Sequence, residues 1–316
     1  MKERKPLIIL TGPTAVGKTS LSIQLAKSIG GEIISADSMQ VYRSMDIGSA
    51  KITKEEMEGI PHYLIDVLEP WEEFNVVSFQ HMAREAMKTI YSHNHIPIVV
   101  GGTGFYIQSL LYDIDFTEND GDDAIRKELE ALGREYGLSY LHQMLQEIDP
   151  ESAELIHENN QKRVIRAIEF YKQTGKKISD HNKKERDRES PYDFLYYVIH
   201  TDRDLLYERI DHRVDQMIRQ GLTAEVQQLK ESGCTKNMTS MQGLGYKEIY
   251  DYLNQDCTLE EAVYTIKRDT RHFAKRQLTW FKREKEVKWL FLPEYGNDTS
   301  AVLEEILRDT REKWSN

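Results

Sequence analysis

Eight residues near the start of the chain have the spacing of a phosphate-binding loop. They match G-x-x-x-x-G-K-[ST] at every fixed position, in the order Gly12, Pro13, Thr14, Ala15, Val16, Gly17, Lys18 and Thr19. The two glycines allow backbone angles that turn successive N–H groups toward an anion, and Lys18 adds a positive charge. The hydroxyl of Thr19 can bind a magnesium ion that bridges two phosphates. The pattern predicts a site for a polyphosphate or pyrophosphate with Mg2+, without identifying the molecule that carries it.

A carboxylate follows the next apolar run of the chain. Asp37 comes two residues after the end of the run 32–35, EIIS, which has the character of a buried strand. In an open parallel sheet, ligands bind in the crevice at the carboxyl ends of the strands. Asp37 is therefore a candidate general base, and the alternative is an aspartate that only caps a turn or a helix.

A third apolar run, residues 96–100, ends in Gly101-Gly102-Thr103. At this place ATP-hydrolysing P-loop proteins usually carry an acid that helps to hold magnesium. Here two glycines let a ligand approach the backbone, and Thr103 offers a hydroxyl instead of a charge. The substitution argues against an ATPase, whereas a small-molecule kinase remains an alternative.

Strands and helices that position these residues follow from the periodicity of the sequence. The pattern predicts an α/β protein: a parallel sheet of the P-loop NTPase type, flanked by helices, with an all-helical insertion. Strands are expected at residues 7–10, 32–35, 61–67, 96–100, 194–200 and 287–292. Helices are expected after the phosphate loop, at 77–91, from 201 to 221, at 258–283 and at the end of the chain.

Residues 114–190 contain helical patterns that no strand interrupts, and a Lys/Arg-rich loop at 173–191 is expected to close this part. We therefore expect a first core part at 1–113, a helical insertion at 114–190, and a second core part with a basic helix at 191–316.

The net charge of the 316 residues is −11, but the charges are segregated along the chain. Residues 161–188 hold ten Lys/Arg against four Asp/Glu, and residues 264–288 hold nine against three. Each basic stretch alone is explained equally well by a solvated helix face. Together they indicate an anionic partner larger than a nucleotide.

Other features place limits on the type of protein. No apolar run approaches the roughly 20 residues that span a bilayer, and the first residues lack a secretory signal, so we expect a cytoplasmic protein without a membrane partner. Cys234 and Cys257 are too few for a disulfide framework. The histidines at 81, 93 and 95 are interpreted as ordinary surface residues, because their spacing matches no metal site.

Six segments occur in the order found in bacterial tRNA dimethylallyltransferases, and nearly the whole chain resembles that family. The segments are GPTAVGKT, ISADSMQVYRSMDIGSAK, IPIVVGGTGFYIQSLL, RVDQMIRQGLTAEV, QGLGYKE and TRHFAKRQLTWFKR. Such enzymes transfer a dimethylallyl group from dimethylallyl pyrophosphate to the exocyclic N6 amine of the adenosine 3′ of the anticodon. The resemblance implies tRNA, held by its anticodon stem-loop, as the partner; we expect a monomer.

The resemblance also implies roles for individual residues. Asp37 would be the general base, Arg213 the cation that contacts pyrophosphate, and Thr103 would lie near the reacting amine. Residues implied to contact tRNA are Asp37, Ser38, Met39, Gln40, Thr103, Arg126, Gln161, Lys162, Arg163, Val164, Ile165, Met241, Gln242, Gly243, Leu244, Gly245, Tyr246, Lys247, Lys275, Arg276, Gln277, Leu278, Thr279, Trp280, Phe281 and Lys282.

Three alternatives are weighed against this interpretation. An adenylate isopentenyltransferase would use the same chemistry on free nucleotide, but the insertion and the basic helix argue against it. A P-loop small-molecule kinase is favoured only by the phosphate loop. In a non-catalytic RNA-binding protein, Asp37 and Arg213 would have no chemical role.

Overall fold

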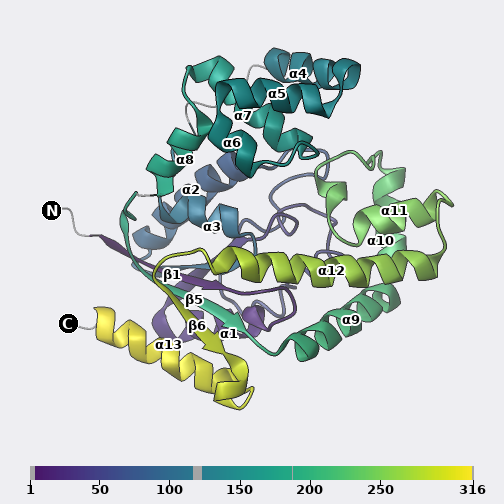
Figure 1. Cartoon of the computed structure of the whole chain (residues 1–316). Helices are drawn as coiled ribbons and strands as arrows, with labels where there is room; N and C mark the ends of the chain where they lie inside the picture. Colours follow the sequence, from purple (N-terminus) through teal and green to yellow (C-terminus); the bar gives the residue numbers. More distant parts are fainter. Residues whose placement is uncertain (1–3, 117–122, 187, 315–316) are drawn as a thin grey trace. The chain divides into compact units, whose positions relative to one another are not determined.

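The computed structural model describes residues 4–116, 123–186 and 188–314. The chain forms two compact units, one made of Met1–Leu110 with Pro191–Asn316 and the other of Leu111–Ser190 (Figure 1). The first unit contains the sheet, and the second is helical.

Six parallel strands form the sheet of the first unit in the order β3-β2-β4-β1-β5-β6. Their bounds are β1 Lys5–Thr11, β2 Gly31–Ala36, β3 His62–Tyr63, β4 Ile96–Gly101, β5 Tyr192–His200 and β6 Val287–Phe291. The buried apolar run at the centre of β1 is typical of a strand covered on both faces. The fold is the predicted α/β class with a P-loop-like parallel sheet.

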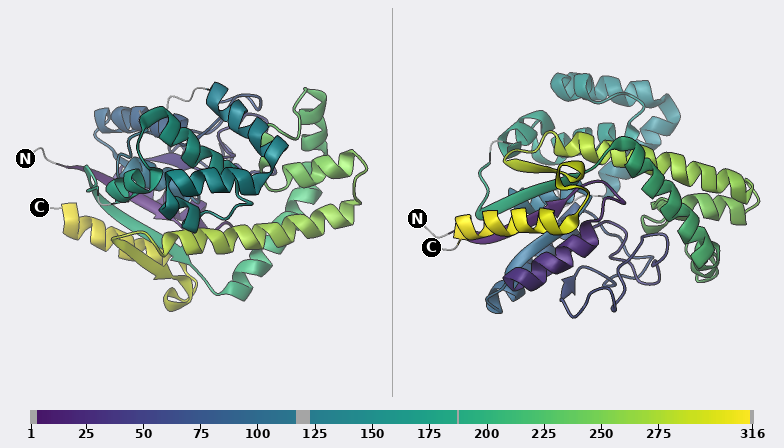
Figure 2. Two further views of the ribbon diagram at one scale, coloured as in Figure 1. Left: turned by 45° about the horizontal axis from the view of Figure 1, so that its top comes forward. Right: turned by 90° about the horizontal axis from the view of Figure 1, so that it is seen from below.

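Helices cover both faces of this sheet. On one face, α1 (Lys18–Ile29) and α13 (Thr299–Trp314) lie together (Figures 1 and 2). Their buried side chains share one core cluster with Ile8 and Leu10 of β1. On the other face lies α2 (Val76–Ser92), which contacts β2 and β4, followed in the chain by α3 (Gly104–Leu111). Because successive side chains of each strand point to opposite faces of the sheet, a separate core forms on each face.

Four helices of the C-terminal half extend from the carboxyl edge of the sheet (Figure 2). They are α9 (Arg203–Gln220), α10 (Leu222–Glu231), α11 (Tyr246–Leu253) and α12 (Leu259–Phe281), with a short 3-10 helix, η2, at Ser240–Gln242. Helix α12 begins with a capping box in which the Thr258 side chain accepts from the Glu261 N–H and the Glu261 carboxylate accepts from the Thr258 N–H.

The helical unit has a core of its own. Its helices are α4 (Asp123–Tyr136), α5 (Leu138–Ile148), α6 (Pro150–Leu155), α7 (Gln161–Thr174) and α8 (Ile178–Arg186). Leu129, Leu141, Leu145 and Ile168 are fully buried in one cluster. Leu141 and Leu145 are four residues apart on α5, and Val164 and Ile168 are four residues apart on α7, which is the spacing of an apolar stripe.

Two expectations about secondary structure were wrong. The strand expected at 61–67 has only two residues, because Leu64 (φ 63°) and Asp66 (φ 54°) adopt left-handed backbone angles that a strand cannot contain. The loop expected at 173–191 contains α8.

Buried Asp149 accepts hydrogen bonds from the backbone N–H and hydroxyl groups of both Ser152 in α6 and Ser179 in α8, at 2.7 to 3.1 Å. This carboxylate therefore fixes the starts of two helices.

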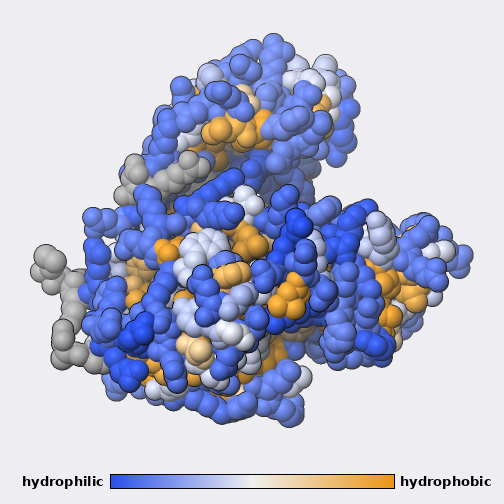
Figure 3. Space-filling model, turned by 60° about the horizontal axis from the view of Figure 1, so that its bottom comes forward, coloured by the Kyte–Doolittle hydropathy of each residue, from blue (hydrophilic) through white to orange (hydrophobic). Residues whose placement is uncertain are grey.

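Polar residues dominate the face of the molecule in Figure 3, and apolar residues form small separate groups there. Within the described residues, no helix is both long and apolar enough to cross a membrane.

We predict that Asp149→Ala loosens the helical unit locally. Burial alone would raise the pKa of Asp149, but hydrogen bonds from Ser152 and Ser179 lower it. The carboxylate is therefore ionised at neutral pH, and its contribution to the stability of the helical unit is lost only in acid. Removing it leaves donors unsatisfied, at about 1–3 kcal/mol. Hydrogen exchange of α6 and α8 should become about tenfold faster or more. Glu154→Ala, at an exposed position of α6, is the matched control; equal protection in both variants would contradict the role.

Candidate active site

Three loops of the sheet unit begin side by side. Gly101, at the end of β4, pairs with Thr11 at the end of β1 and with Ala36 at the end of β2. The Thr11 hydroxyl also donates to the Gly101 carbonyl at 2.6 Å. The phosphate loop, the Gly-Gly-Thr loop and Asp37 follow these three strands directly. They therefore border one crevice at the carboxyl edge, where parallel sheets bind ligands.

The phosphate loop has the backbone conformation that its sequence indicates. Gly12 (φ 151°) and Gly17 (φ 102°) have positive φ angles, and a side chain on Gly12 would come within 2.3 Å of the Ile199 carbonyl. Helix α1 begins at Lys18, so its unpaired N–H groups and positive dipole end lie at the loop. The Lys18 ammonium group donates to the carbonyls of Gly12 and Pro13 at 3.0 and 2.8 Å.

Lys18 and Arg213 bring two positive charges close together. Burial, and then the charge of Arg213, lower the pKa of Lys18 to about 7, whereas Asp37 acts in the opposite direction. Burial also lowers the pKa of Arg213. The Arg213 side chain has no hydrogen bond or ion pair with any residue that the structure describes. Because only Asp37 partly compensates these two positive charges, Lys18 and Arg213 form a site for an anion of high charge.

Ion pairs on either side of Arg213 fix its helix. Asp211 pairs with Arg271 at 2.5 Å, and Asp215 pairs with Lys267 at 2.6 Å. Both pairs join α9 to α12 at a spacing of one helical turn. The guanidinium of Arg213 is thereby carried on a helix held at two points.

Asp37 forms a turn with one oxygen. Its Oδ1 accepts from the backbone N–H groups of Met39 and Gln40 at 2.8 and 3.3 Å. The capping interpretation is therefore correct for this oxygen. Its Oδ2 has no hydrogen-bond partner among the described residues, and the carboxylate is half-buried. The turn holds the carboxylate in place and leaves Oδ2 available to accept a proton.

Thr103 lies beside the end of β2. Its N–H donates to the Ala36 carbonyl at 3.2 Å, and its own carbonyl accepts from Tyr106 and Ile107 in α3. A side chain on the next residue, Gly104, would come within 2.2 Å of the Trp280 ring. The indole of α12 therefore packs directly on this loop.

Gln277 joins two of the loops. Its Oε1 accepts from the Thr14 N–H at 2.9 Å, and its Nε2 donates to the Gly102 carbonyl at 3.0 Å. A side chain on Gly102 would collide with this amide at 2.1 Å. Gln277 had been expected to contact tRNA. Instead it is 6% exposed and holds the phosphate loop against the Gly-Gly-Thr loop.

Several other residues expected to contact tRNA are also buried. They are largely covered by neighbouring residues of their own units, which leaves little of their surface accessible. They are Val164, Ile165, Met241, Tyr246 and Phe281, together with the backbone positions Gly243 and Gly245. Tyr246 donates its hydroxyl to Glu225 at 2.8 Å.

The remaining residues of this set keep accessible side chains. In the sheet unit, Gln242, Lys275, Arg276, Thr279 and Lys282 are exposed, and Ser38, Met39, Gln40, Leu244, Lys247, Leu278 and Trp280 are half-buried. In the helical unit, Arg126, Lys162 and Arg163 are exposed and Gln161 is half-buried. Arg126 pairs with the buried Glu169 at 3.3 Å.

The sequence did not reveal the role of Glu225. Its carboxylate accepts from the backbone N–H groups of Asp46, Ile47 and Gly48 at 2.7 to 3.1 Å. It therefore supports the loop that follows Asp37. No sequence signal could have indicated this contact, because the donors are backbone groups far away in the chain.

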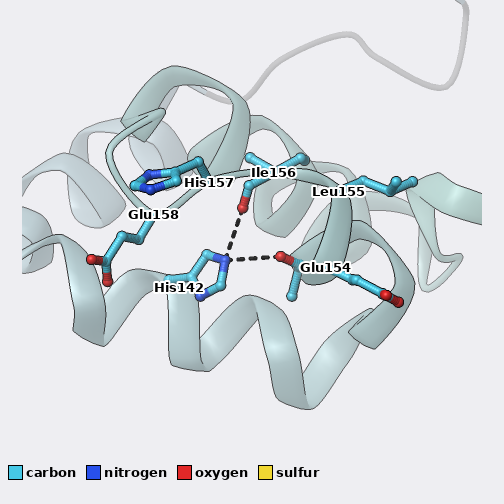
Figure 4. Close-up of a pocket in the computed structure, with 7 residues that line it drawn as sticks. His142, Glu154, Leu155, Ile156, His157 and Glu158 are labelled. Carbon is cyan, nitrogen blue, oxygen red and sulfur yellow. Dashed lines mark hydrogen bonds between the residues drawn. The ribbon is translucent and has the colours of Figure 1, made fainter.

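A hollow in the helical unit contains none of the predicted site residues (Figure 4). It is lined by His142 and residues 153–158. The His142 Nε2–H donates to the carbonyls of Ala153 and Ile156 at 3.0 and 2.9 Å, so this histidine joins α5 to the end of α6.

A parallel sheet whose first strand leads into this phosphate loop defines an α/β protein of the P-loop class. The IPP transferase family model matches residues 40–284, and the isopentenyl transferase model matches residues 5–69. The chain belongs to the IPP transferase family, as its sequence resemblance indicated, and is a transferase enzyme.

Relatives match nearly the full chain. The tRNA dimethylallyltransferase of Lachnoclostridium phytofermentans is 62% identical over 98% of both chains, and that of Carboxydothermus hydrogenoformans is 54% identical over 90% of this chain and 91% of its own. The crystal structure of a tRNA isopentenylpyrophosphate transferase from Bacillus halodurans has a TM-score of 0.73 at 43% identity, covering 98% of both chains. A eukaryotic dimethylallyltransferase acting on tRNA has a TM-score of 0.79 at 32% identity, over 91% of this chain and 74% of that one.

We predict that Gln277→Ala weakens the binding of inorganic pyrophosphate about tenfold. The substitution leaves the Thr14 N–H and the Gly102 carbonyl without their shared partner, at about 1–3 kcal/mol. Isothermal titration calorimetry measures the affinity. Thr279→Ala, an exposed position on the same helix, is the matched control. Unchanged affinity in Gln277→Ala would show that the bridge does not organise the loop.

Proposed function

We propose that this enzyme transfers a dimethylallyl group from dimethylallyl pyrophosphate to the N6 amine of the adenosine 3′ of the anticodon in tRNA. The observation that carries the proposal is the convergence of Lys18, Arg213 and Asp37 at one edge of the sheet, with the cations facing an anion site and the carboxylate at its border. Membership of the IPP transferase family and the names of the relatives support this reaction.

In this reaction the allylic carbon–oxygen bond breaks, and negative charge builds on the departing pyrophosphate. Lys18, Arg213 and the N–H groups at the start of α1 stabilise that charge. Groups already held in place at low solvent exposure contribute several kcal/mol each to such stabilisation. The phosphate loop thus serves a leaving group, and no phosphoryl group is transferred.

Thr19 fits the role of a magnesium ligand. Its hydroxyl is a hard oxygen donor in the first turn of α1, it is exposed, and it has no hydrogen bond with the residues that the structure describes. Mg2+ is commonly held by one or two protein oxygens together with substrate phosphates and water. When bound there, the ion would neutralise part of the pyrophosphate charge.

Asp37 removes the proton of the attacking amine. The adenine amine is a weak nucleophile because its lone pair is delocalised into the ring. Oδ2 of Asp37 accepts its proton as the new carbon–nitrogen bond forms, while the turn through Oδ1 keeps the carboxylate in position. Thr103 lies near the amine, since its loop begins at the strand beside β2.

Exposed basic side chains on both units bind the anticodon stem-loop. In the sheet unit these are Lys275 and Arg276 of α12 and Lys282 at its C-terminal cap. In the helical part, residues 114–190, they are Arg126, Lys162 and Arg163. Contacts to the RNA backbone compensate the few kcal/mol needed to unstack the target adenine. One chain supplies all these groups, so we propose a monomer, acting on tRNA in the cytoplasm.

A kinase remains the second candidate only on the strength of the phosphate loop. Against it, β4 ends in Gly101-Gly102-Thr103 without the acid that such enzymes use. The names of the relatives likewise favour tRNA over free nucleotide as the acceptor.

The test is the incorporation of label from dimethylallyl pyrophosphate into unmodified tRNA, beside a minihelix without the target adenosine and beside AMP. Label in tRNA alone is expected. Label in AMP would assign the free-nucleotide reaction, and ATP consumption without label transfer would assign a kinase.

We predict that Asp37→Asn lowers kcat by about 10² to 10⁴ and leaves the KM for dimethylallyl pyrophosphate nearly unchanged. An asparagine oxygen can still accept the two N–H groups of the turn, so the substitution removes the base and keeps the loop. Steady-state kinetics on tRNA give both constants. Asp46→Asn, a nearby exposed acid, should behave as wild type. A rise in KM that matches the fall in kcat would assign Asp37 to binding.

Binding of dimethylallyl pyrophosphate at about pH 8 should take up a proton. The pKa of Lys18 is about 7, so the free side chain is mostly neutral at this pH. A bound pyrophosphate favours the charged form and raises that pKa. Calorimetry in buffers of different ionisation enthalpy measures the uptake. It should disappear in Lys18→Met and remain in Lys27→Met on the same helix; uptake retained in Lys18→Met would assign it to another group.

A further inference from the structure

Glu32, His93 and His95 meet at the opposite edge of the sheet from the active site. Glu32 is the second residue of β2, His93 follows the last residue of α2, and His95 precedes β4. Asp37, which follows the last residue of β2, comes five residues after Glu32, or about 16 Å at 3.3 Å per residue. The cluster is therefore separate from the groups that react.

The side chains converge on one carboxylate oxygen. The Nδ1 atoms of His93 and His95 lie 2.8 and 2.6 Å from Glu32 Oε1. One ligand atom from each of the three residues can be chosen so that all lie within 4.8 Å of one another. The Tyr63 hydroxyl donates to the other oxygen, Oε2, at 2.6 Å.

The end of α2 explains why two histidines so close in sequence point the same way. Asn94, between them, has a left-handed backbone (φ 58°), and the His95 N–H donates to the Ile90 carbonyl at 3.1 Å. This is the tight reversal that commonly ends a helix. It turns both imidazoles toward Glu32, so the arrangement is built by the backbone.

Charge at this place is incompletely balanced. The Glu32 side chain is 2% exposed, and no lysine or arginine of the described residues pairs with it. A divalent ion between these side chains would add positive charge beside the carboxylate.

We propose that Glu32, His93 and His95 form a binding site for one Zn2+ ion. Two imidazole nitrogens and a carboxylate oxygen are a common ligand set for zinc, and a water would occupy the fourth position. Both imidazoles are nearly half exposed, at 48% and 44%, so the ion has access and the rings can move. Ligand atoms in a tetrahedral zinc site are about 3.3 Å apart. The two Nδ1–Oε1 distances, 2.8 and 2.6 Å, therefore need to open by less than about 1 Å.

Tyr63 would support the site as an outer partner. Its hydrogen bond to Oε2 fixes the carboxylate orientation and leaves Oε1 for the ion. The ion would join the connection between α2 and β4 to β2, and through Tyr63 to β3. Its expected effect is on the stability of this edge.

The experiment titrates the full chain, stripped of metal, with Zn2+ in a buffer containing Mg2+, and uses Co2+ absorption to report coordination. The wild-type protein should bind one equivalent of Zn2+, whereas the His93→Asn and His95→Asn variants should bind none at this site. Asparagine places an amide N–H close to the position of Nδ1, so these variants keep a hydrogen bond to Glu32 and lose the metal ligand. His81→Asn, an exposed histidine on α2, should bind as wild type.

Two further measurements distinguish a site from a hydrogen-bonded cluster. Tyr63→Phe should keep the stoichiometry and lower the affinity about 10–100-fold. Zn2+ should raise the Tm of wild type and His81→Asn, and leave the Tm of the His93→Asn and His95→Asn variants unchanged. No zinc uptake by wild type, or equal uptake by His93→Asn, would overturn the proposal.

Discussion

The electrostatic repulsion between Lys18 and Arg213 is the constraint around which the sheet unit is arranged. Burial of two cations near each other is unfavourable, and the protein opposes it with only the partial compensation of Asp37. The arrangement persists because each cation is carried by a rigid element. Lys18 starts a helix packed on the sheet, and Arg213 lies between two ion pairs. A multiply charged anion bound beside Lys18 and Arg213 would compensate both their burial and their mutual repulsion.

Local signals made most of the fold predictable from the sequence. The apolar runs gave the positions of β1, β2, β4, β5 and β6, because buried parallel strands need continuous apolar residues. Gly30 ends α1 in a left-handed backbone conformation, which a glycine at the end of a helical pattern predicts. The phosphate loop was recognisable because backbone sterics and charge fix its residue types. The family resemblance, confirmed by the relatives, rests on the same segments.

Features that depend on distant partners were not predictable in this way. The start of α8 is held by Asp149, and the loop after Asp37 by Glu225, and neither pairing leaves a local pattern. Gln277 lies in a basic, aromatic segment that suggested RNA contact, yet its amide is used inside the protein. His93 and His95 look like isolated surface residues until the turn at Asn94 brings them to Glu32. Sequence spacing predicts on which face of a helix a residue lies. The residue that its side chain contacts depends on the tertiary fold.

The bridge made by Gln277 also bears on the synthesis of the protein. Thr14 is separated from it by 263 residues, so the phosphate loop leaves the ribosome long before the group that fixes it. A nascent chain that ends before α12 can build β1, β2 and β4 but lacks both this bridge and the partners of Asp211 and Asp215. The phosphate loop can therefore be held against the Gly-Gly-Thr loop only after α12 has been synthesised.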